Sequence, residues 1–381
     1  MNYTSRIIST YSADVFGVCS ALFELGGMVI MHDASGCNST YTTHDEPRWY
    51  DMESMVYISG LSEMEAIMGD DEKLISDIVS AAEDLKPKFI AVAGTPIPTM
   101  TGFDFEAVAA LIEERTGIPA FGFPTTGMNS YVHGAGMALE AVARRFTSKS
   151  VCKTTFPSAN ILGLTPLDFT VNGTDHAIAR FLEDAGYRVL SRWAMGSTLE
   201  ELAQAGSAHV NLVVSSSGLA AAKALRELFG TPYVIGVPVG PDHSGQIQNA
   251  LAEAVSSGEN QFPLSDLPEG DLLIIGEAVT SLSLASAVES ATGKGAVVLC
   301  PTELDTGLMR PKDLLLQTEE DIQQAMSQAK MVIADPLFQP ICPQNVRFIK
   351  LPAESFTGRL FREEIPNLVS EFKTFLVRCC Q

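Results

Sequence analysis

The chain has 381 residues, of which 46% are hydrophobic and 19% are charged, so it can form the cores of two or three domains of ~150 residues each. Its 46 Asp and Glu side chains outnumber its 25 Lys and Arg side chains, and the net charge of −21 argues against a nucleic-acid partner, because phosphate binding needs clustered positive charge. No apolar run reaches the ~18 residues of a membrane helix, and the first residues lack a signal-peptide pattern, so we expect a cytoplasmic protein without membrane contact.

Short apolar segments alternate with amphipathic segments along most of the chain. Strands are expected at residues 28–31, 89–93, 160–163, 188–190, 210–214, 233–235, 272–275, 296–299, 331–333 and 347–349. Helices are expected at residues 13–25, 105–116, 175–185, 219–229, 247–256, 281–291 and 319–329. The strands are apolar on both faces, as buried parallel strands are, and several helices end at a glycine. The alternation predicts an α/β fold with doubly wound parallel sheets.

Two polar segments mark domain boundaries. Residues 147–158 are rich in Lys, Thr and Ser, and residues 258–270 contain two prolines and several acidic side chains. We therefore expect three Rossmann-like domains at 1–150, 151–265 and 266–381, the last with a C-terminal helix.

Common catalytic motifs are missing from the sequence. It has no Gly-x-Gly-x-x-Gly after a strand, no P-loop, no Gly-x-Ser-x-Gly and no His-Glu-x-x-His. The seven cysteines are odd in number and form no Cys-x-x-Cys pair, which argues against a disulfide framework or a zinc ribbon. A metal site must then be assembled from distant segments or from more than one chain.

The segment from residue 13 to residue 37 brings two of these cysteines together. Cys19 lies six residues before the end of the helix 13–25, or ~9 Å along its axis. The strand 28–31 then returns by ~13–16 Å, so Cys37 reaches the level of Cys19 or passes it. Cys37 follows Gly36, which lets the backbone approach a bulky cluster. Both cysteines are candidate metal ligands, although Cys19 also suits simple packing on its apolar stripe.

This arrangement is similar to that of a known family. Residues 32–37 read His-Asp-Ala-Ser-Gly-Cys. The segment resembles the component 1 subunits of nitrogenase and of the dark-operative protochlorophyllide and chlorophyllide reductases. In that family an early helix carries one cluster cysteine, and a strand leads into a His-Gly-Pro-x-Gly-Cys-like loop that carries the second.

A more specific similarity lies in residues 59–74. They read Ser-Gly-Leu-Ser-Glu-Met-Glu-Ala-Ile-Met-Gly-Asp-Asp-Glu-Lys-Leu and resemble the family's Ser-x-x-Leu-x-Glu-x-Asp-x-Ile/Val-Phe-Gly-Gly-x-x-Lys-Leu segment. Further similar segments are residues 86–92, 161–163, 209–215, 230–233 and 236–240. The resemblance spans most of the chain and is strongest in residues 13–130. It implies three Rossmann-like domains as in nitrogenase component 1 subunits, with the cluster in the first.

The chain also departs from the family pattern. Pro96 stands where the family has its third cluster cysteine, Ser215 stands where the cofactor cysteine follows a strand, and residues 350–355 contain no His. The resemblance therefore implies neither an eight-iron cluster nor a dinitrogen-reducing catalytic subunit. Two chains would supply four thiolates, the number that one 4Fe–4S cluster needs. Alternatively, a different partner chain supplies three ligands, or His32 or Asp33 contributes one.

The resemblance implies an iron–sulfur reductase subunit, in a homodimer or in a heteromer with a related subunit. An ATP-dependent iron protein would donate electrons to a 4Fe–4S cluster at the subunit interface, held by Cys19 and Cys37 with Gly36 beside it. The candidate proton donors are His32, Asp33, His44 and Asp45.

Two alternatives stay open at this point. One is a non-catalytic scaffold for metallocofactor assembly. The other is a metabolite-binding α/β protein whose cysteines only pack in the core. The acidic net charge fits simple solubility as well as a partner with a positive docking face.

Overall fold

The structure, a computed structural model, describes residues 5–7, 12–36, 38, 41, 45–149, 151–265, 267–302 and 305–380. Its strands are short: β1 (Met28–Met31), β2 (Met55–Ile58), β3 (Ile90–Ala93), β4 (Ala120–Phe123), β5 (Ser158–Leu162), β6 (Arg188–Trp193), β7 (Val210–Val213), β8 (Tyr233–Ile235), β9 (Leu272–Ile275), β10 (Ala296–Cys300), β11 (Leu314–Leu315), β12 (Met331–Ala334) and β13 (Arg347–Lys350).

The helices lie between these strands. The α-helices are α1 (Asp14–Leu22), α3 (Glu63–Met68), α4 (Asp71–Leu85), α5 (Pro96–Thr101), α6 (Phe105–Thr116), α7 (Tyr131–Phe146), α8 (Pro166–Phe169), α9 (Thr174–Asp184), α10 (Leu199–Leu202), α11 (Leu219–Phe229), α12 (Pro241–Ser257), α13 (Ala278–Thr292), α14 (Glu319–Gln328), α15 (Glu354–Thr357) and α16 (Leu368–Cys380). The short 3-10 helices are η2 (Ala205–Ser207), η3 (Ser216–Gly218), η4 (Thr306–Leu308), η5 (Pro336–Ile341) and η6 (Gly358–Glu364).

The strands form three parallel sheets, one after another along the chain. Their strand orders are β2-β1-β3-β4, β6-β5-β7-β8 and β11-β10-β9-β12-β13. Every strand pair in these sheets is parallel. This confirms the α/β fold with doubly wound parallel sheets that the strand–helix alternation predicts. The exact limits of the three domains stay a prediction.

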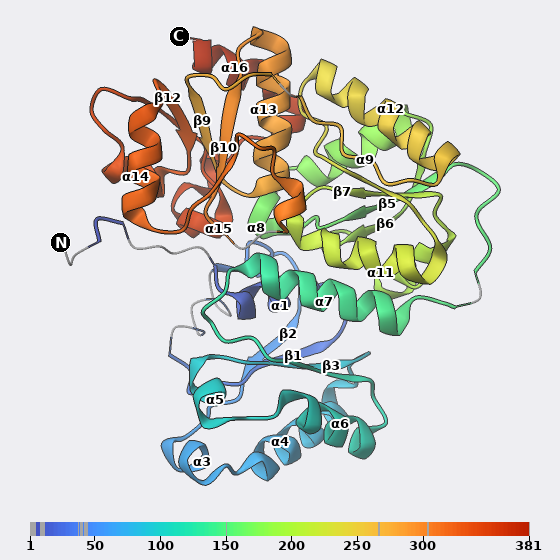
Figure 1. Cartoon of the computed structure of the whole chain (residues 1–381). Coiled ribbons are helices and arrows are strands. Elements are labelled where there is room, and N and C mark those ends of the chain that lie inside the picture. Colours follow the sequence, from blue (N-terminus) through green and yellow to red (C-terminus); the bar gives the residue numbers. More distant parts are fainter. Residues whose placement is uncertain are drawn as a thin grey trace.

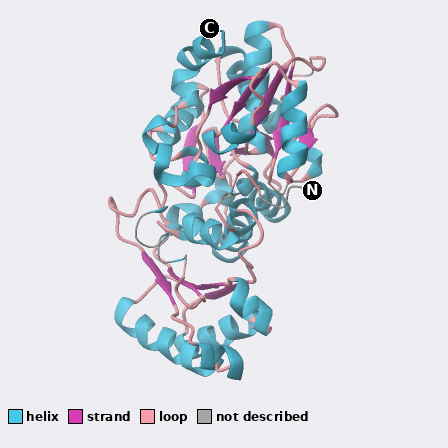
Figure 2. Ribbon diagram, turned by 90° about the vertical axis from the view of Figure 1, so that its left-hand side faces the viewer, coloured by secondary structure: helices cyan, strands magenta, loops and turns pink. Residues whose placement is uncertain are grey.

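Each sheet is covered by helices on both faces, because both faces of its central strands are apolar. In β1, Val29 and Met31 join the core formed with α1 and α7. The alternate residues Met28 and Ile30 join a separate core with α4 and α6 on the opposite face. Figure 2 shows the first sheet between these two helical layers. Side chains of successive strand residues point to opposite faces, so this pattern requires a doubly wound arrangement.

Helix α7 lies at the junction of the first sheet with the rest of the molecule (Figure 1). It packs against α1 on one side and against α11 of the second sheet on the other. One apolar core is continuous from the first sheet through the second to the third, and it includes Val29, Ile161 and Ile274. Among the helices of the described chain, none combines the length and apolar character that a membrane crossing requires.

The close approach of α1 and α7 depends on glycines. A Cβ added at Gly134 of α7 would lie 1.8 Å from the backbone oxygen of Asp14, and one added at Gly17 of α1 would lie 2.1 Å from that of Tyr131. Real side chains never approach backbone so closely. The glycines therefore set the distance between the helix that carries Cys19 and the helix that joins the sheets.

We predict opposite effects of alanine at two neighbouring glycines of α7. Gly134→Ala should lower the free energy of unfolding by about 1–3 kcal/mol, because the helices must separate. In the matched control, Gly136→Ala, the nearest atom to the new Cβ is 3.8 Å away. That variant should be neutral or up to about 1 kcal/mol more stable, since alanine favours helix. Thermal unfolding of both variants tests this, and equal midpoints would refute the packing account.

Candidate functional site

Helix α1 is fixed at its first turn by a buried carboxylate. Asp14 has no exposed surface, and its side chain accepts hydrogen bonds from the backbone N–H groups of Thr126 at 3.0 Å and Gly127 at 2.8 Å. These donors belong to the loop that follows β4, at the carboxyl end of the first sheet. Asp14 thereby sets the position of α1 relative to the edge of the sheet where open α/β sheets bind ligands.

Cys19 lies on α1 with no exposed surface. The ring of Tyr41 stacks on Phe16, one turn earlier, with centroids 4.8 Å apart. Burial, and then the negative charge of Glu46, raise the pKa of the Cys19 thiol far above its ordinary value. The neutral thiol is therefore the stable form in this environment. A thiolate there requires a compensating cation, and the iron of a cluster would supply one.

The polar candidates His32 and Asp33 lie at the carboxyl end of β1. The Nδ1 atom of His32 is 2.9 Å from Ser59 Oγ, and its ring packs on Phe103 with centroids 4.4 Å apart. Burial lowers the pKa of His32 to about 4. His32 is thus a neutral imidazole at pH 7, which makes it a poor general acid.

The loop after β1 continues from Asp33 toward Gly36. The Asp33 carboxylate accepts a hydrogen bond from the side-chain amide of Asn38. Gly36 is exposed and has a φ of +29°, and a Cβ placed there would meet open space. The left-handed backbone, rather than crowding, is therefore the reason for glycine at this position.

Two of the sequence candidates, Cys37 and His44, lie outside the described residues. Asp45 is described, and its backbone oxygen accepts a hydrogen bond from Arg362 at 3.1 Å. Among the described residues, no group of three or more His, Cys, Asp or Glu side chains is placed to hold a metal ion. The described residues therefore form no complete metal site by themselves, and Cys19 stays a candidate ligand.

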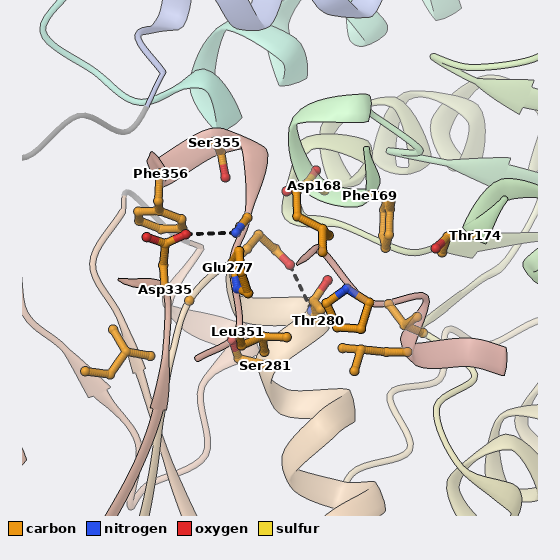
Figure 3. A pocket seen from close by; sticks show the side chains of 18 of the residues that line it. Asp168, Phe169, Thr174, Glu277, Thr280, Ser281, Asp335, Leu351, Ser355 and Phe356 are labelled. Atoms are coloured by element: carbon orange, nitrogen blue, oxygen red, sulfur yellow. Dashed lines mark hydrogen bonds between the residues drawn. The ribbon is translucent and has the colours of Figure 1, made fainter. Parts of the chain in front are cut away.

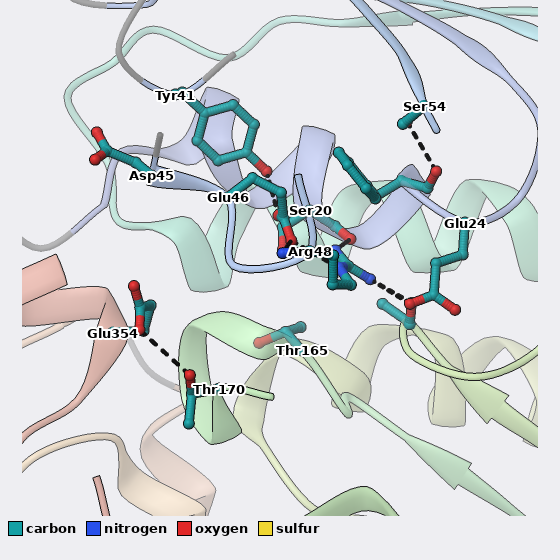
Figure 4. A network of polar contacts seen from close by, with 12 residues as sticks. Ser20, Glu24, Tyr41, Asp45, Glu46, Arg48, Ser54, Thr165, Thr170 and Glu354 are labelled. Atoms are coloured by element: carbon teal, nitrogen blue, oxygen red, sulfur yellow. Dashed lines mark hydrogen bonds and ion pairs between the residues drawn. The ribbon is translucent and has the colours of Figure 1, made fainter. Parts of the chain in front are cut away.

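A buried charge network, which the sequence did not reveal, covers α1 (Figure 4). Arg48 Nε donates to Glu46 at 2.6 Å, and its Nη1 donates to Glu24 at 2.9 Å. The same guanidinium donates to the backbone oxygens of Ser20 at 2.8 Å and Ala194 at 3.1 Å. It thus joins α1, the segment after residue 45 and the loop after β6. No local pattern predicts contacts between residues so distant in sequence.

The network also holds the residues that enclose Cys19. Tyr41 donates its hydroxyl to Glu46 at 2.8 Å. Glu24 accepts a further hydrogen bond, 2.6 Å long, from the backbone N–H of Gly196 near the second sheet. Arg48 lies over the ring of Phe23, 4.7 Å from its centroid. The surroundings of the Cys19 thiol are therefore set by contacts between the first and second sheets.

An exposed apolar surface adjoins the end of β1. On α3, Met64, Ile67 and Met68 are 67%, 69% and 72% exposed, and on the neighbouring α5 Met100 is 86% exposed. We call these four side chains the methionine patch. Exposed acidic residues border it on α3 and at the start of α4. Clusters of exposed large apolar side chains with a polar rim are typical of protein interaction sites.

A family model described as nitrogenase component 1 type oxidoreductase matches residues 14–265, about two thirds of the chain. The chain belongs to this family. The match begins at the first residue of α1 and includes the first two sheets.

The individual relatives in this component 1 family have low sequence identity to the chain. A light-independent protochlorophyllide reductase subunit of Nostoc punctiforme is 25% identical over 243 residues, which cover 60% of this chain and 47% of the relative. The nitrogenase iron-molybdenum cofactor biosynthesis protein NifE of a Nostoc species is 24% identical over 255 residues, 65% of this chain and 50% of the relative. The chain thus spans about half the length of the curated relatives it matches.

A solved structure confirms the family fold over the full length. Nitrogenase Cp1 at pH 6.5 superposes with a TM-score of 0.71 at 15% identity, covering 100% of this chain and 95% of that chain. At this identity the likeness establishes the fold alone.

The departures from the family pattern have clear local structures. Pro96 is the first residue of α5, a position that suits proline because its missing N–H has no helical partner. Ser215 caps the 3-10 helix η3, where its hydroxyl accepts a hydrogen bond from the N–H of Ser217. Gly102, with a φ of +78°, ends α5, and Asp104 caps α6 by accepting a hydrogen bond from the N–H of Ala107.

Replacing Arg48 tests the charge network. Arg48→Met should lower the free energy of unfolding by about 3–5 kcal/mol, because Glu46 would stay buried without its cation. Arg144→Met is the matched control, since Arg144 forms ion pairs on an exposed surface. It should change stability by at most about 1 kcal/mol. Denaturant unfolding compares the two, and similar losses would rule out a special role for Arg48.

His32 gives a pH prediction. Its pKa is lowered from 6.5 to about 4 in the folded chain, so the unfolded chain binds more protons between these values. The His32 contribution to stability is therefore present above pH 6.5 and lost as the pH falls toward 4. His32→Gln should flatten this part of the pH dependence of thermal unfolding. His176→Gln, at an exposed histidine, is the control and should leave this part of the pH dependence unchanged. An NMR titration of His32 with a midpoint near pH 6.5 would show that its pKa is not lowered.

Proposed function

We propose that the chain is an iron–sulfur reductase subunit of the component 1 type. It accepts electrons from an ATP-dependent iron protein through a 4Fe–4S cluster at a subunit interface and passes them to a bound substrate. Cys19 and Cys37 are the proposed ligands, with Gly36 beside the cluster. The observation that carries the proposal is the buried Cys19 thiol on the first helix of the region that matches the family.

Contacts of described residues support the pairing of the two cysteines. Asn38, which follows Cys37 in the chain, is hydrogen-bonded to Asp33 at the end of β1. Tyr41 is stacked on Phe16 of α1. The chain after Cys37 is thus tied at Asn38 to the carboxyl end of β1 and at Tyr41 to the helix that carries Cys19. Both anchors favour a site between α1 and that edge of the sheet.

A second chain is needed to complete the site. Two copies of this chain would supply four thiolates, the number that one 4Fe–4S cluster needs; a related subunit would have to supply two ligands beside Cys19 and Cys37. A cluster bound there would supply storage of one electron at a time. The Arg48 network would fix the α1 side of the site, and burial around Cys19 would exclude water from the sulfur.

The methionine patch supports docking of an electron donor. It lies close to the proposed cluster, since Glu65 and Ala66 of α3 and Phe103 after α5 line one cleft with His32. Its acidic rim suits a donor with a basic rim around an apolar face. The chain itself has no P-loop, so ATP hydrolysis would belong to the donor.

The alternative is a scaffold on which a metallocofactor is assembled. One observation favours it. The chain is about as similar in sequence to a cofactor biosynthesis protein, at 24% identity, as it is to a reductase subunit, at 25%. Both functions predict a bound cluster. They differ in whether ATP-dependent reduction of the cluster leads to turnover.

Metal analysis after anaerobic purification tests the ligands. The wild type should contain about four irons and four sulfides per dimer and give an iron–sulfur EPR signal on reduction. Cys19→Ala and Cys37→Ala should each lose most of the iron. Cys152→Ala, at an exposed cysteine, should keep it. Iron retained in both ligand variants would exclude the proposed site.

A charge placed in the methionine patch tests donor docking. Met68→Glu should weaken the complex with an iron protein by about tenfold or more, because a central apolar contact becomes a buried charge. Val377→Glu on α16 introduces the same charge at a position that is 55% exposed, and it should leave binding unchanged. Complex formation is measured by analytical gel filtration with a non-hydrolysable ATP analogue. Equal binding of both variants would place the donor elsewhere.

A further inference from the structure

A cavity of about 70 Å³ lies between the second and third sheets, at the carboxyl ends of β9 and β12. Figure 3 shows its polar side chains converging from three elements: Asp168 from α8, Glu277 and Thr280 from the start of α13, and Asp335 from the end of β12. Phe169 and Phe356 form part of its apolar wall. The volume suits a ligand of a few heavy atoms.

Glu277 is already satisfied by structural contacts. Its carboxylate accepts hydrogen bonds from the N–H groups of Val279 and Thr280 at 3.0 and 2.8 Å, which caps α13. It also accepts from the N–H and hydroxyl of Ser216 at 2.9 and 2.6 Å. These four donors occupy its carboxylate, so Glu277 holds the start of α13 against η3.

Asp335 has a comparable structural role. Its carboxylate accepts from the N–H groups of Leu337 and Ala353, both at 2.8 Å, and from the hydroxyl of Thr357 at 2.9 Å. It caps the 3-10 helix η5 and ties the end of β12 to the start of α15. These structural contacts account for the buried Asp335 carboxylate without a ligand.

Asp168 is the carboxylate of the cavity that can still accept a hydrogen bond from a ligand. It accepts hydrogen bonds from three hydroxyls, those of Thr165, at 2.8 Å, Tyr131 and Ser215. Burial, and then the charge of Glu277, raise the pKa of Asp168 above its ordinary value. Its ionised form thus lacks a positive partner, which a bound cation would supply.

Two further features point to a cationic ligand. None of the described residues that line the cavity is Lys, Arg or His, so its three carboxylates face no basic side chain there. The hydroxyl oxygen of Thr280 is buried and makes no hydrogen bond to any described residue. A buried hydroxyl usually has a partner, so this oxygen is an available acceptor for a ligand N–H group.

We propose that this cavity binds a compact organic cation, an amidinium or a small alkylammonium. Asp168 accepts its N–H groups, Thr280 accepts a further one, and Phe169 and Phe356 contact its apolar part. Nitrogen cations suit both the negative charge and the aromatic wall. The cation would bind in the cavity between the second and third sheets. This binding does not depend on the proposed cluster or on electron transfer.

A matched pair of probes tests the proposal on the full chain. Acetamidinium and acetamide have the same shape and differ in charge. At pH 8, which favours the ionised carboxylate over the neutral acid more than pH 7 does, isothermal titration calorimetry should give an affinity at least tenfold higher for acetamidinium. Equal affinities, or no binding of acetamidinium, overturn the proposal even without any variant.

Variants locate the site. Asp168→Asn keeps an acceptor for Tyr131 and should abolish the preference for acetamidinium. Thr280→Val should weaken acetamidinium binding several-fold. Asp271→Asn removes an exposed carboxylate of the third sheet and should change neither value. A preference that persists in Asp168→Asn, with an unfolding midpoint like that of the wild type, places the cation elsewhere and refutes the assignment.

Discussion

The buried guanidinium of Arg48 is the interaction on which the rest of the candidate site depends. It is held by Glu46 and Glu24, and it reaches the backbone of α1 and of the loop after β6. A buried cation with two carboxylates is costly unless its geometry is complete, so this network tolerates little displacement. It therefore fixes the surroundings of Cys19 more rigidly than apolar packing alone would.

The three parallel sheets explain why polar groups gather where they do. Parallel strands end at one edge, and ligands in such folds bind at that edge. In the first sheet the edge presents His32 and Asp33, close to α1 and the methionine patch. In the third sheet the corresponding edge presents Glu277 and Asp335, which cap helices, and the neighbouring Asp168 of α8 is the carboxylate proposed to bind a cation. The same topology thus produces one proposed redox site and one proposed cation site.

The sequence predicted the buried strands well and the marginal ones poorly. The strands β1 and β9 have the predicted limits, because both of their faces are apolar and turns bound them. Strands β2 and β4 lie at the edges of the first sheet, are mostly half-buried, and were missed. The Arg48 network was invisible for another reason. Its contact with Ala194 joins residues 146 positions apart, and only tertiary packing brings them together.

The proposed function requires that the chain receives electrons rather than only carries a cluster. To test this, the iron-loaded protein is mixed with a reduced iron protein and MgATP, and the EPR signal of the cluster is followed by rapid freeze-quench. The account predicts that the cluster signal changes only when ATP is hydrolysed, and that Met68→Glu slows the change. A cluster that is present but is never reduced in the presence of ATP would contradict electron acceptance by this chain.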